Sequence, residues 1–318
     1  MRRHAFRPEY RDDSIIDFDG SLQEANDFST SESAVNPKLL PRLSHRKERF
    51  FLTSINRHPC FNDNRGNYAR IHLPVAPECN IQCNYCVRQF DCVNESRPGV
   101  TSKVLSPEEA LRKYLTAKQI VKNLTIVGIA GPGDPLANWP VVKETIQKIK
   151  AADQEAQFCL STNGLLLPEL VDELNGAGVH FLTVTVNALE PEVGRNIYRY
   201  VRWEGEKIEG EAGFQILSRN QLEGIRMAAE RGMICKVNTV VVSGINDTCI
   251  ASIAAKAKSL GCYLFNAMSL IPVKGSEFAI IPVMNEMKMH SIRKQCGVFI
   301  KQMYHCQRCR ADATGCLK

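Results

Sequence analysis

Three closely spaced cysteines, Cys79, Cys83 and Cys86, follow the pattern Cys-x3-Cys-x2-Cys in the stretch ECNIQCNYCVRQFDC. A structural zinc site is closed by four ligands, so these thiols would need a distant fourth ligand to hold zinc. Three thiolates can instead hold three irons of a cubane iron–sulfur cluster and leave the fourth iron open. The spacing therefore predicts an iron–sulfur site with an open position, and zinc binding or chance clustering are the alternatives.

The order of the two spacings, with the aromatic Tyr85 just before the third cysteine, resembles the signature of radical S-adenosylmethionine (SAM) enzymes. That resemblance implies a four-iron cluster whose open iron chelates the amino and carboxylate groups of SAM. An electron from the cluster would split the sulfonium and give an adenosyl radical. Tyr85 is expected to contribute to the cofactor site.

A second polar stretch, Gly-Pro-Gly-Asp-Pro, covers residues 131–135. Because glycine lets a backbone approach a ligand closely, Gly131, Gly133 and Asp134 are predicted to contact the methionyl end of SAM. Alone the pattern is weak, since Pro and Gly also make plain turns and an Asp can cap the following segment. Four further candidate contacts lie on later predicted strands, where internal hydrogen bonding is the alternative: Thr185, Asn187, Val237 and Asn238.

Several of the other cysteines among the 13 in the chain also suggest metal binding. Cys306 and Cys309 have the Cys-x2-Cys spacing of metal sites. The flanking Arg308 and Arg310 would favour thiolates and offset an anionic cluster. Two ligands cannot complete a site, so three further thiols are the natural recruits: Cys60, Cys92 and Cys159.

Some of these candidates have simpler explanations. Cys159 could be a small core residue. His58 and His305 each lie beside a candidate cysteine, where a structural role and a role in ligation or proton transfer are both open. Of the two, His58 is kept as a candidate metal ligand.

The composition limits the class of protein. Of the 318 residues, 44% are hydrophobic, which is ordinary for a globular chain, and the formal net charge of +6 is too diffuse to indicate nucleic acid binding. The opening MRRHAFRPEY has no apolar stretch after it, and no run of about 18 apolar residues exists, so neither a secretory signal nor a membrane span is predicted. A cytoplasmic location is expected, where thiols stay reduced and clustered ones indicate metal or redox chemistry.

The chain divides into a polar start and a patterned remainder. Residues 1–45 are rich in Ser, Asn, Asp, Arg and Lys and are predicted to form a flexible or extended arm. Such an arm could be a solvated tail, or it could pack over the site or dock a partner. Residues 46–318 are predicted to form one barrel domain with a C-terminal cluster-binding segment.

Strand and helix patterns alternate through that domain, which predicts an α/β fold with a parallel sheet. We expect a full or partial TIM-type β/α barrel, with N- and C-terminal extensions over the barrel mouth and the chemistry at the carboxyl ends of the strands. The expected strands are 68–76, 124–130, 156–164, 180–189, one starting at 233, and 262–271. The expected helices are 106–121, 139–152, 167–178, about 216–231, 247–261 and 285–304.

Seven stretches together closely resemble the NifB family, the radical SAM enzymes of nitrogenase cofactor assembly, over roughly residues 50–318. Two of their segments, NESRPGV and CRADA, are not general features of the superfamily. The stretches are HPCF (58–61), ARIHLPVAPECNIQCNYC (69–86), DCVNESRPGV (91–100), VGIAGPGDPLAN (127–138), CLSTNG (159–164), KVNTVVVSGIND (236–247) and HCQRCRADATG (305–315).

The resemblance implies a specific reaction. A methyl group from SAM is placed on a cluster sulfide, an adenosyl radical abstracts hydrogen from it, and two four-iron clusters fuse around a carbide with an added sulfur. The product is an eight-iron precursor of the nitrogenase cofactor. The implied partners are an iron–sulfur cluster donor, a ferredoxin-type electron donor and a cofactor carrier or scaffold protein, with no nucleic acid and no membrane.

The same resemblance assigns residues. It implies that five cysteines ligate the two substrate clusters: Cys60, Cys92, Cys159, Cys306 and Cys309. Glu95 and Arg97 would lie near the clusters as charge or proton partners.

The chain departs from the family in one stretch. NifB-like proteins usually carry a His-His pair after the His-Pro-Cys segment, whereas residues 62–67 here are Asn-Asp-Asn-Arg-Gly-Asn. One cluster would then lack a ligand unless His58, His72, His305 or an external group supplies it. The chain is also expected to need a separate carrier, because it lacks the carrier-like C-terminal domain of some members.

Two other functions remain open at this point. One is a diverged radical SAM enzyme with auxiliary clusters that acts on another cluster, a peptide or a small molecule. The other is a non-catalytic iron–sulfur carrier or a nucleic-acid-binding protein that uses the basic arm.

Overall fold

The structure is a computed structural model of the chain. It describes residues 52–62, 66–94, 96–99, 101 and 103–317. The arm predicted for residues 1–45 lies outside the described residues. Within the described part, no helix is long and apolar enough to cross a membrane.

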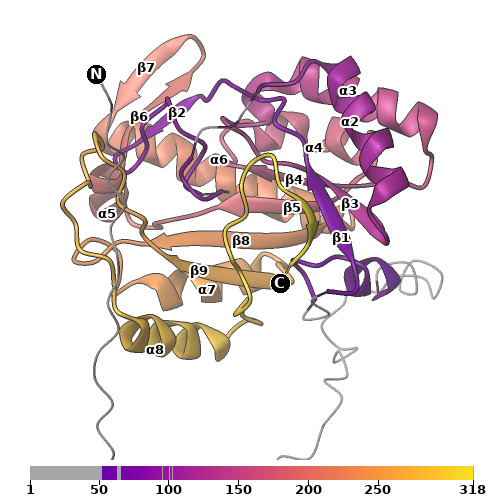
Figure 1. Cartoon of the computed structure of the whole chain (residues 1–318). Coiled ribbons are helices and arrows are strands. Elements are labelled where there is room, and N and C mark those ends of the chain that lie inside the picture. The colour runs from indigo at the N-terminus through magenta and orange to yellow at the C-terminus, as the bar shows by residue number, and fades with distance from the viewer. Residues whose placement is uncertain (1–51, 63–65, 95, 100, 102, 318) are drawn as a thin grey trace, which may run out of the picture. The chain divides into compact units, whose positions relative to one another are not determined.

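A curled sheet forms the framework of the domain (Figure 1). Six parallel strands lie in the order β1 (Ala69–His72), β3 (Leu124–Ile129), β4 (Gln157–Thr162), β5 (Val179–Thr185), β8 (Ile234–Val241) and β9 (Leu264–Ser269). The six predicted strands and the partial β/α barrel are therefore confirmed. The sequence did not predict β10 (Thr314–Cys316), which pairs antiparallel with β1 at the edge of the sheet.

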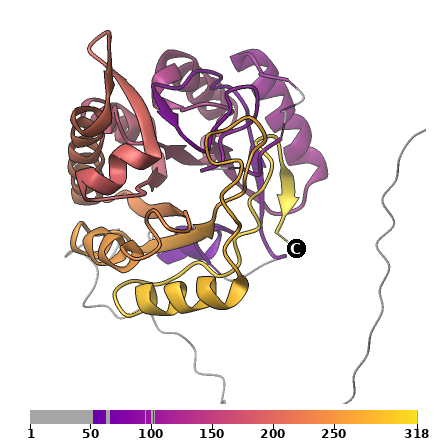
Figure 2. The same ribbon diagram turned by 90° about the vertical axis from the view of Figure 1, so that its left-hand side faces the viewer.

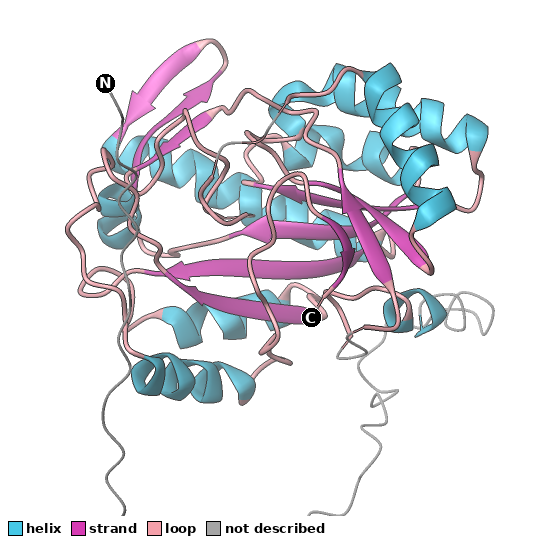
Figure 3. Ribbon diagram, viewed as in Figure 1, coloured by secondary structure: helices cyan, strands magenta, loops and turns pink. Residues whose placement is uncertain are grey.

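Helices pack around the outside of this curled sheet (Figures 2 and 3). The capping box predicted from Ser106 and Glu109 is present at the start of the first of them. Their apolar faces meet the sheet in a core that includes Phe158, Leu182 and Phe265. They are α2 (Pro107–Ile120), α3 (Trp139–Ala152), α4 (Leu167–Gly176), α6 (Gly210–Glu230), α7 (Ile250–Ser259) and α8 (Glu286–Gly297), with a short 3-10 helix, η2 (Leu136–Asn138), before α3.

Two predicted helix boundaries are wrong. The helix expected from about residue 216 begins at Gly210, because its polar, glycine-containing first turns show no apolar periodicity. The helix expected to reach residue 304 ends at Gly297. The chain beyond it extends beside β9 instead, where the amide of Met303 donates to the carbonyl of Phe265 at 2.9 Å.

A second, three-stranded sheet holds the cysteine loop and was not predicted. Strand β2 (Ile81–Cys83) pairs with β6 (Tyr198–Trp203), which pairs with β7 (Glu206–Glu209), all antiparallel. A short helix, α5 (Pro191–Ile197), leads into β6. Glu204 and Gly205 turn the β6–β7 hairpin with φ of 50° and 81°, as a primed two-residue turn requires. The second cysteine of the motif is therefore fixed within a sheet.

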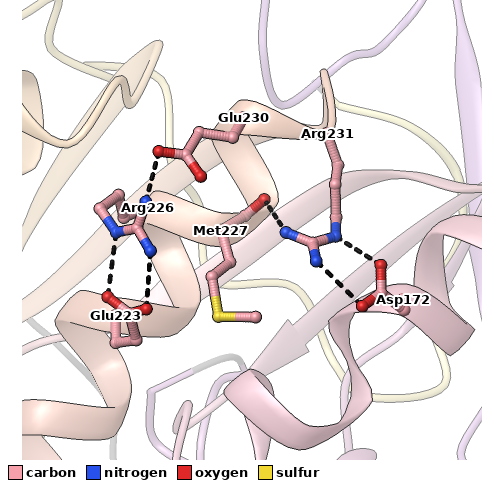
Figure 4. Close-up of polar contacts among 6 residues, drawn as sticks. All are labelled: Asp172, Glu223, Arg226, Met227, Glu230 and Arg231. Carbon is pink, nitrogen blue, oxygen red and sulfur yellow. Dashed lines mark hydrogen bonds and ion pairs between the residues drawn. The ribbon is translucent and has the colours of Figure 1, made fainter.

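Helices α4 and α6 pack closely because α6 has a glycine at the contact. A Cβ atom added to Gly224 would lie 2.6 Å from Cγ and 2.7 Å from Cβ of Leu167. Near the end of α6, Arg231 donates to both carboxylate oxygens of Asp172 on α4, at 2.6 and 2.9 Å, and to the carbonyl of Met227 at 3.0 Å (Figure 4). Asp172 is exposed, so the glycine contact is expected to matter more for stability than this ion pair.

We predict that Gly224→Ala destabilises the protein by about 1–3 kcal/mol, because the new methyl group must displace Leu167 in a packed core. The better helix propensity of Ala offsets at most about 1 kcal/mol of that cost. The matched control is Gly176→Ala at the end of α4, where an added Cβ atom would meet nothing within 4 Å. Thermal unfolding compares the two, and equal melting temperatures would contradict the prediction.

Candidate functional site

The carboxyl ends of parallel strands share one edge of a barrel, and a small cavity at that edge is lined by all three cysteines of the motif. We call it the triple-thiol cavity. Its wall consists of Cys79, Ile81, Cys83, Tyr85, Cys86, Arg88, Cys92, Asn94, Gly133, Asp134, Ser161 and Asn163. Within the described residues, no three His, Cys, Asp or Glu side chains could hold a single metal ion. In an iron–sulfur cluster each thiolate binds its own iron atom, so the thiols need not converge on one point.

Tyr85 is fully buried and anchors the cysteine loop to the strands. Its hydroxyl donates to Oδ1 of Asn94 and accepts from Nδ2 of Asn187, both at 2.6 Å. Oδ1 of Asn187 accepts in turn from the amide of Val240 at 2.8 Å. Tyr85 and Asn187 were both predicted to bind the cofactor. Their polar groups instead form hydrogen bonds with each other and with other residues of the protein.

The charge balance of the triple-thiol cavity disfavours bare thiolates. Burial raises the pKa of Cys79 to about 12, the Asp134 carboxylate adds to this effect, and Arg88 opposes it. Burial, followed by the neighbouring thiols, also raises the pKa of Cys83 well above its usual value. Burial lowers the pKa of Arg88, but the thiols, Cys79 first, outweigh burial and raise it. A positively charged metal centre would supply the charge that these thiolates need.

The carboxylate of Asp134 links two strand ends. It is buried and accepts hydrogen bonds from the hydroxyl of Thr162 at 2.9 Å, the amide of Asn163 at 2.6 Å and the amide of Leu136 at 2.9 Å. Nδ2 of Asn163 lies 3.8 Å from Sγ of Cys79. Asp134 thus positions a residue that touches the first cysteine, and its predicted contact with SAM stays a prediction.

The two glycines of residues 131–135 differ in their placement. Gly133 lines the triple-thiol cavity, and a Cβ atom there would lie 2.0 Å from the carbonyl oxygen of Glu78, so this close approach of two loops requires glycine. Gly131 has a φ of 115°, in the left-handed region, and does not line the cavity. Their predicted contacts with SAM also stay predictions.

The candidates on the later strands face in different directions. Val237 is buried in the core between sheet and helices, whereas Asn238 lines a second cavity and donates to the carbonyl of Asn94 at 3.0 Å. The carbonyl of Thr185 accepts from Nε2 of Gln221 at 2.8 Å. None of these three lines the triple-thiol cavity.

That second cavity, the four-thiol cavity, brings together cysteines from three distant parts of the chain. Cys60, Cys159, Cys306 and Cys309 all line it, and so does His58. Cys92 lines the triple-thiol cavity instead. Ser161, two residues after Cys159 on β4, lines both cavities, so the two sites are neighbours.

Three cations also line the four-thiol cavity: Arg70, Lys236 and Arg308. Nη2 of Arg70 lies 2.6 Å from Sγ of Cys309, and burial lowers the pKa of Arg308 to about 10. The two arginines that flank Cys309 differ, since Arg310 is exposed and pairs with Asp312. Burial raises the pKa of Cys60 to about 11, and Lys236 is the main opposing influence.

The histidines connect the segments that carry these thiols. Nδ1 of His58 accepts from the amide of Cys60 at 3.1 Å, and burial lowers the pKa of His58 well below its usual value. Nε2 of His305 lies 3.0 Å from the carbonyl of Pro59, which joins the two cysteine-bearing segments. His72 also lines the four-thiol cavity, and burial lowers its pKa to about 4.

Glu95 and Arg97 are the predicted charge partners of the clusters. Glu95 lies outside the described residues. The Arg97 side chain is exposed and lines neither cavity, although its amide donates to the carbonyl of Cys309 at 3.0 Å.

Three charged side chains that line the two cavities were not predicted from the sequence: Arg88, Arg70 and Lys236. Arg70 and Lys236 interrupt apolar strand patterns, and an isolated charge in a buried strand is a usable signal of a site. Arg88 gives no comparable signal, because a charged residue in a loop is usually solvated.

A larger cavity of about 310 Å³ lies at the opposite ends of β3 and β4. Its lining includes Arg57, Lys118 and Glu155, and no Cys or His occurs among the described residues of its wall. The described wall of this cavity therefore offers no thiol or imidazole for metal binding.

Comparison with known proteins gives the family. Residues 73–257 match the model of the radical SAM superfamily. Among curated proteins, the FeMo cofactor biosynthesis protein NifB of Chlorobaculum tepidum is 42% identical, over 82% of this chain and 62% of that protein. NifB of Klebsiella pneumoniae is 43% identical over 82% of this chain and 57% of its own length. The chain thus spans little more than half the length of these relatives.

Solved structures support the fold. SuiB of Streptococcus suis, bound to S-adenosylmethionine, has a TM-score of 0.51 at 12% identity and covers 81% of this chain and 54% of its own. The FeFe-hydrogenase maturase HydG of Carboxydothermus hydrogenoformans has a TM-score of 0.51 at 15% identity. The match covers 82% of this chain and 59% of the HydG chain. At such low identity these neighbours bear on the fold alone.

The matched segment includes the cysteine loop, residues 131–135 and strands β3 to β8. The curated relatives confirm the resemblance to NifB that the seven sequence stretches indicate. The chain belongs to the radical SAM superfamily.

Proposed function

We propose that this radical SAM enzyme fuses two four-iron clusters, with a SAM-derived carbide and an added sulfur, into the eight-iron precursor of the nitrogenase cofactor. The observation that carries the proposal is the adjacency of the triple-thiol and four-thiol cavities, which share Ser161. One set of thiols suits a resident cluster and the other suits a substrate cluster. The NifB relatives, named for FeMo cofactor biosynthesis, support this choice of substrate.

The triple-thiol cavity fits the resident cofactor by its donor set. Cys79, Cys83 and Cys86 would hold a four-iron cluster, which when bound would chelate SAM and supply the electron for its cleavage. Arg88 offsets the negative charge of the thiolates. Tyr85 and the residues bonded to it keep the loop fixed against β5 and β8, so that the thiols need little rearrangement.

The four-thiol cavity fits the substrate. Cys60, Cys159, Cys306 and Cys309 line this cavity and are the proposed thiols for one four-iron cluster. Cys92 lines the triple-thiol cavity and is the proposed ligand of a second cluster. The proposed chemistry is methyl transfer from SAM to a cluster sulfide, followed by hydrogen abstraction. The proposed partners are a cluster donor, a ferredoxin-type electron donor and a carrier or scaffold protein for the product.

A diverged radical SAM enzyme with auxiliary clusters, acting on a peptide or small molecule, is the second candidate. The observation that favours it is the missing His-His pair, which leaves one substrate cluster with an incomplete ligand set. Residues 63–65 of that stretch lie outside the described residues.

The first experiment tests the product. We expect about twelve irons per chain after anaerobic reconstitution, for three four-iron clusters. Addition of SAM and a reductant should then yield a cluster that activates nitrogenase lacking its cofactor. Adenosyl products without any change in the clusters would contradict the proposed function and favour the second candidate.

Cys92 allows a sharper test, because it lines the cavity of the three motif cysteines. We predict that Cys92→Ser retains reductive cleavage of SAM but loses about a third of the bound iron, since one of three clusters loses a ligand. Cys83→Ser should abolish cleavage, and the exposed Cys316→Ser should change neither quantity. Loss of SAM cleavage in Cys92→Ser would assign that thiol to the first cluster.

The variant Asp134→Asn distinguishes a structural role of Asp134 from direct binding of Asp134 to SAM. The amide cannot accept the same set of hydrogen bonds from Thr162 and Asn163, so we expect the free energy of unfolding of the metal-free protein to fall by about 1–3 kcal/mol. SAM binding by the reconstituted protein should weaken as a consequence. Weaker SAM binding with unchanged stability would instead show direct contact between Asp134 and SAM.

A further inference from the structure

Buried polar atoms without hydrogen-bond partners gather on the wall of the four-thiol cavity. Five of its residues carry such an atom: His58 Nε2, Arg70 Nε, Thr183 Oγ1, Asn266 Oδ1 and Arg308 Nη1. Buried polar groups are normally hydrogen-bonded within a protein, so this concentration indicates a ligand.

Most of these atoms are hydrogen-bond donors. The two arginine nitrogens always carry hydrogen, and the hydroxyl of Thr183 can donate. Nδ1 of His58 accepts from the amide of Cys60, so in the neutral ring the proton sits on Nε2, which donates as well. The wall therefore suits a ligand rich in acceptors, and Nε2 of His58 in this tautomer would donate to that ligand.

The cavity is also cationic. Arg70 and Lys236 are 6% and 7% exposed, and Arg308 is half-buried. Among the described residues that line the cavity there is no Asp or Glu, and none of the three cations forms an ion pair within the described chain. Buried charges are costly unless they are paired, and no carboxylate of the described residues balances these three cations.

Of the three cations, Lys236 makes the fewest polar contacts within the described chain. Arg70 donates to the carbonyl of Gly315 and to Sγ of Cys309, and Arg308 donates to the carbonyl of Ser269. The ammonium of Lys236 has a contact with the ring of Phe61 at 5.4 Å. Its side chain shares a strand face with Asn238, which also lines the cavity.

We infer that Lys236, with Arg70 and Arg308, makes the four-thiol cavity selective for a net-anionic, sulfide-rich iron–sulfur cluster, and that Lys236 sets how readily this cluster is reduced. A cluster held by thiolates is anionic, and its sulfides accept hydrogen bonds from the donors of the wall. Nearby positive charge favours the reduced cluster, which carries one more negative charge. The inference rests on the proposed function only in taking a cluster as the substrate.

The test uses the full chain with Cys79, Cys83 and Cys86 replaced by Ser, so that bound iron reports on the remaining thiols. After anaerobic reconstitution with ferrous iron and sulfide, bound iron and the reduction potential are measured. The variants are Lys236→Met, which keeps the length and removes the charge, and Lys236→Arg, which keeps the charge. Lys301→Met is the matched control, because Nζ of Lys301 also lies over a ring, Tyr263 at 5.8 Å, but the residue is exposed.

Lys236→Met is expected to shift the reduction equilibrium at least tenfold towards the oxidised cluster, which is about 59 mV for one electron. It should also retain less iron, while Lys236→Arg and Lys301→Met stay near the parent. In the metal-free protein Lys236→Met should raise the melting temperature by about 2–4 °C, because an unbalanced buried charge is removed. That rise excludes misfolding as the cause of lost iron.

Equal potentials and equal iron in Lys236→Met and Lys301→Met would overturn the inference, and so would a parent chain that retains no iron. A shifted potential in the triple-Ser chain, together with a wild-type chain that makes no eight-iron precursor, would support the inference and count against the proposed function. Precursor formation by the wild-type chain, together with an unshifted potential in the triple-Ser chain, would do the reverse.

Discussion

The buried carboxylate of Asp134 joins the ends of neighbouring strands, and the geometry of the triple-thiol cavity depends on it. The carboxylate accepts from Thr162 at the end of β4 and from Asn163 just after it. The backbone amide of Asp134 donates to the carbonyl of Glu78, one residue before the first cysteine of the motif. A buried carboxylate is tolerated only when such donors satisfy it. The loop that would carry the iron is thus positioned by the sheet beneath it, together with the pairing of β2 and β6.

The two cavities differ in charge, and the proposed function assigns them separate roles. The triple-thiol cavity balances Asp134 against Arg88, whereas the described wall of the four-thiol cavity has cations and no carboxylate. Cys159 and Ser161 are two residues apart on β4, so their side chains lie on the same face of the strand. That face borders both cavities. On the proposed function, a radical generated at the first site would arise next to a substrate held at the second.

The sequence predicted the parts of the fold that have local signals. The apolar periodicities, the capping box at Ser106 and the spacing of the three cysteines are all properties of short segments. The sheet of β2, β6 and β7 was missed because residues 81–83 pair with a strand more than a hundred positions away. The convergence of Cys60, Cys159 and Cys306 has no local signal, because tertiary contacts alone bring them together. The number of ligands that a site needs made Cys60 and Cys159 candidates beside Cys306, and the family resemblance implied the same set.

The central claim is that two sets of thiols in adjacent cavities have separate tasks. Mössbauer spectroscopy of the iron-57-reconstituted protein tests it most directly when wild type is compared with Cys306→Ser/Cys309→Ser. The account predicts that the double variant loses cluster iron but keeps the cluster whose spectrum responds to SAM. A double variant with the full iron content, or one that loses the SAM-responsive cluster, would contradict it.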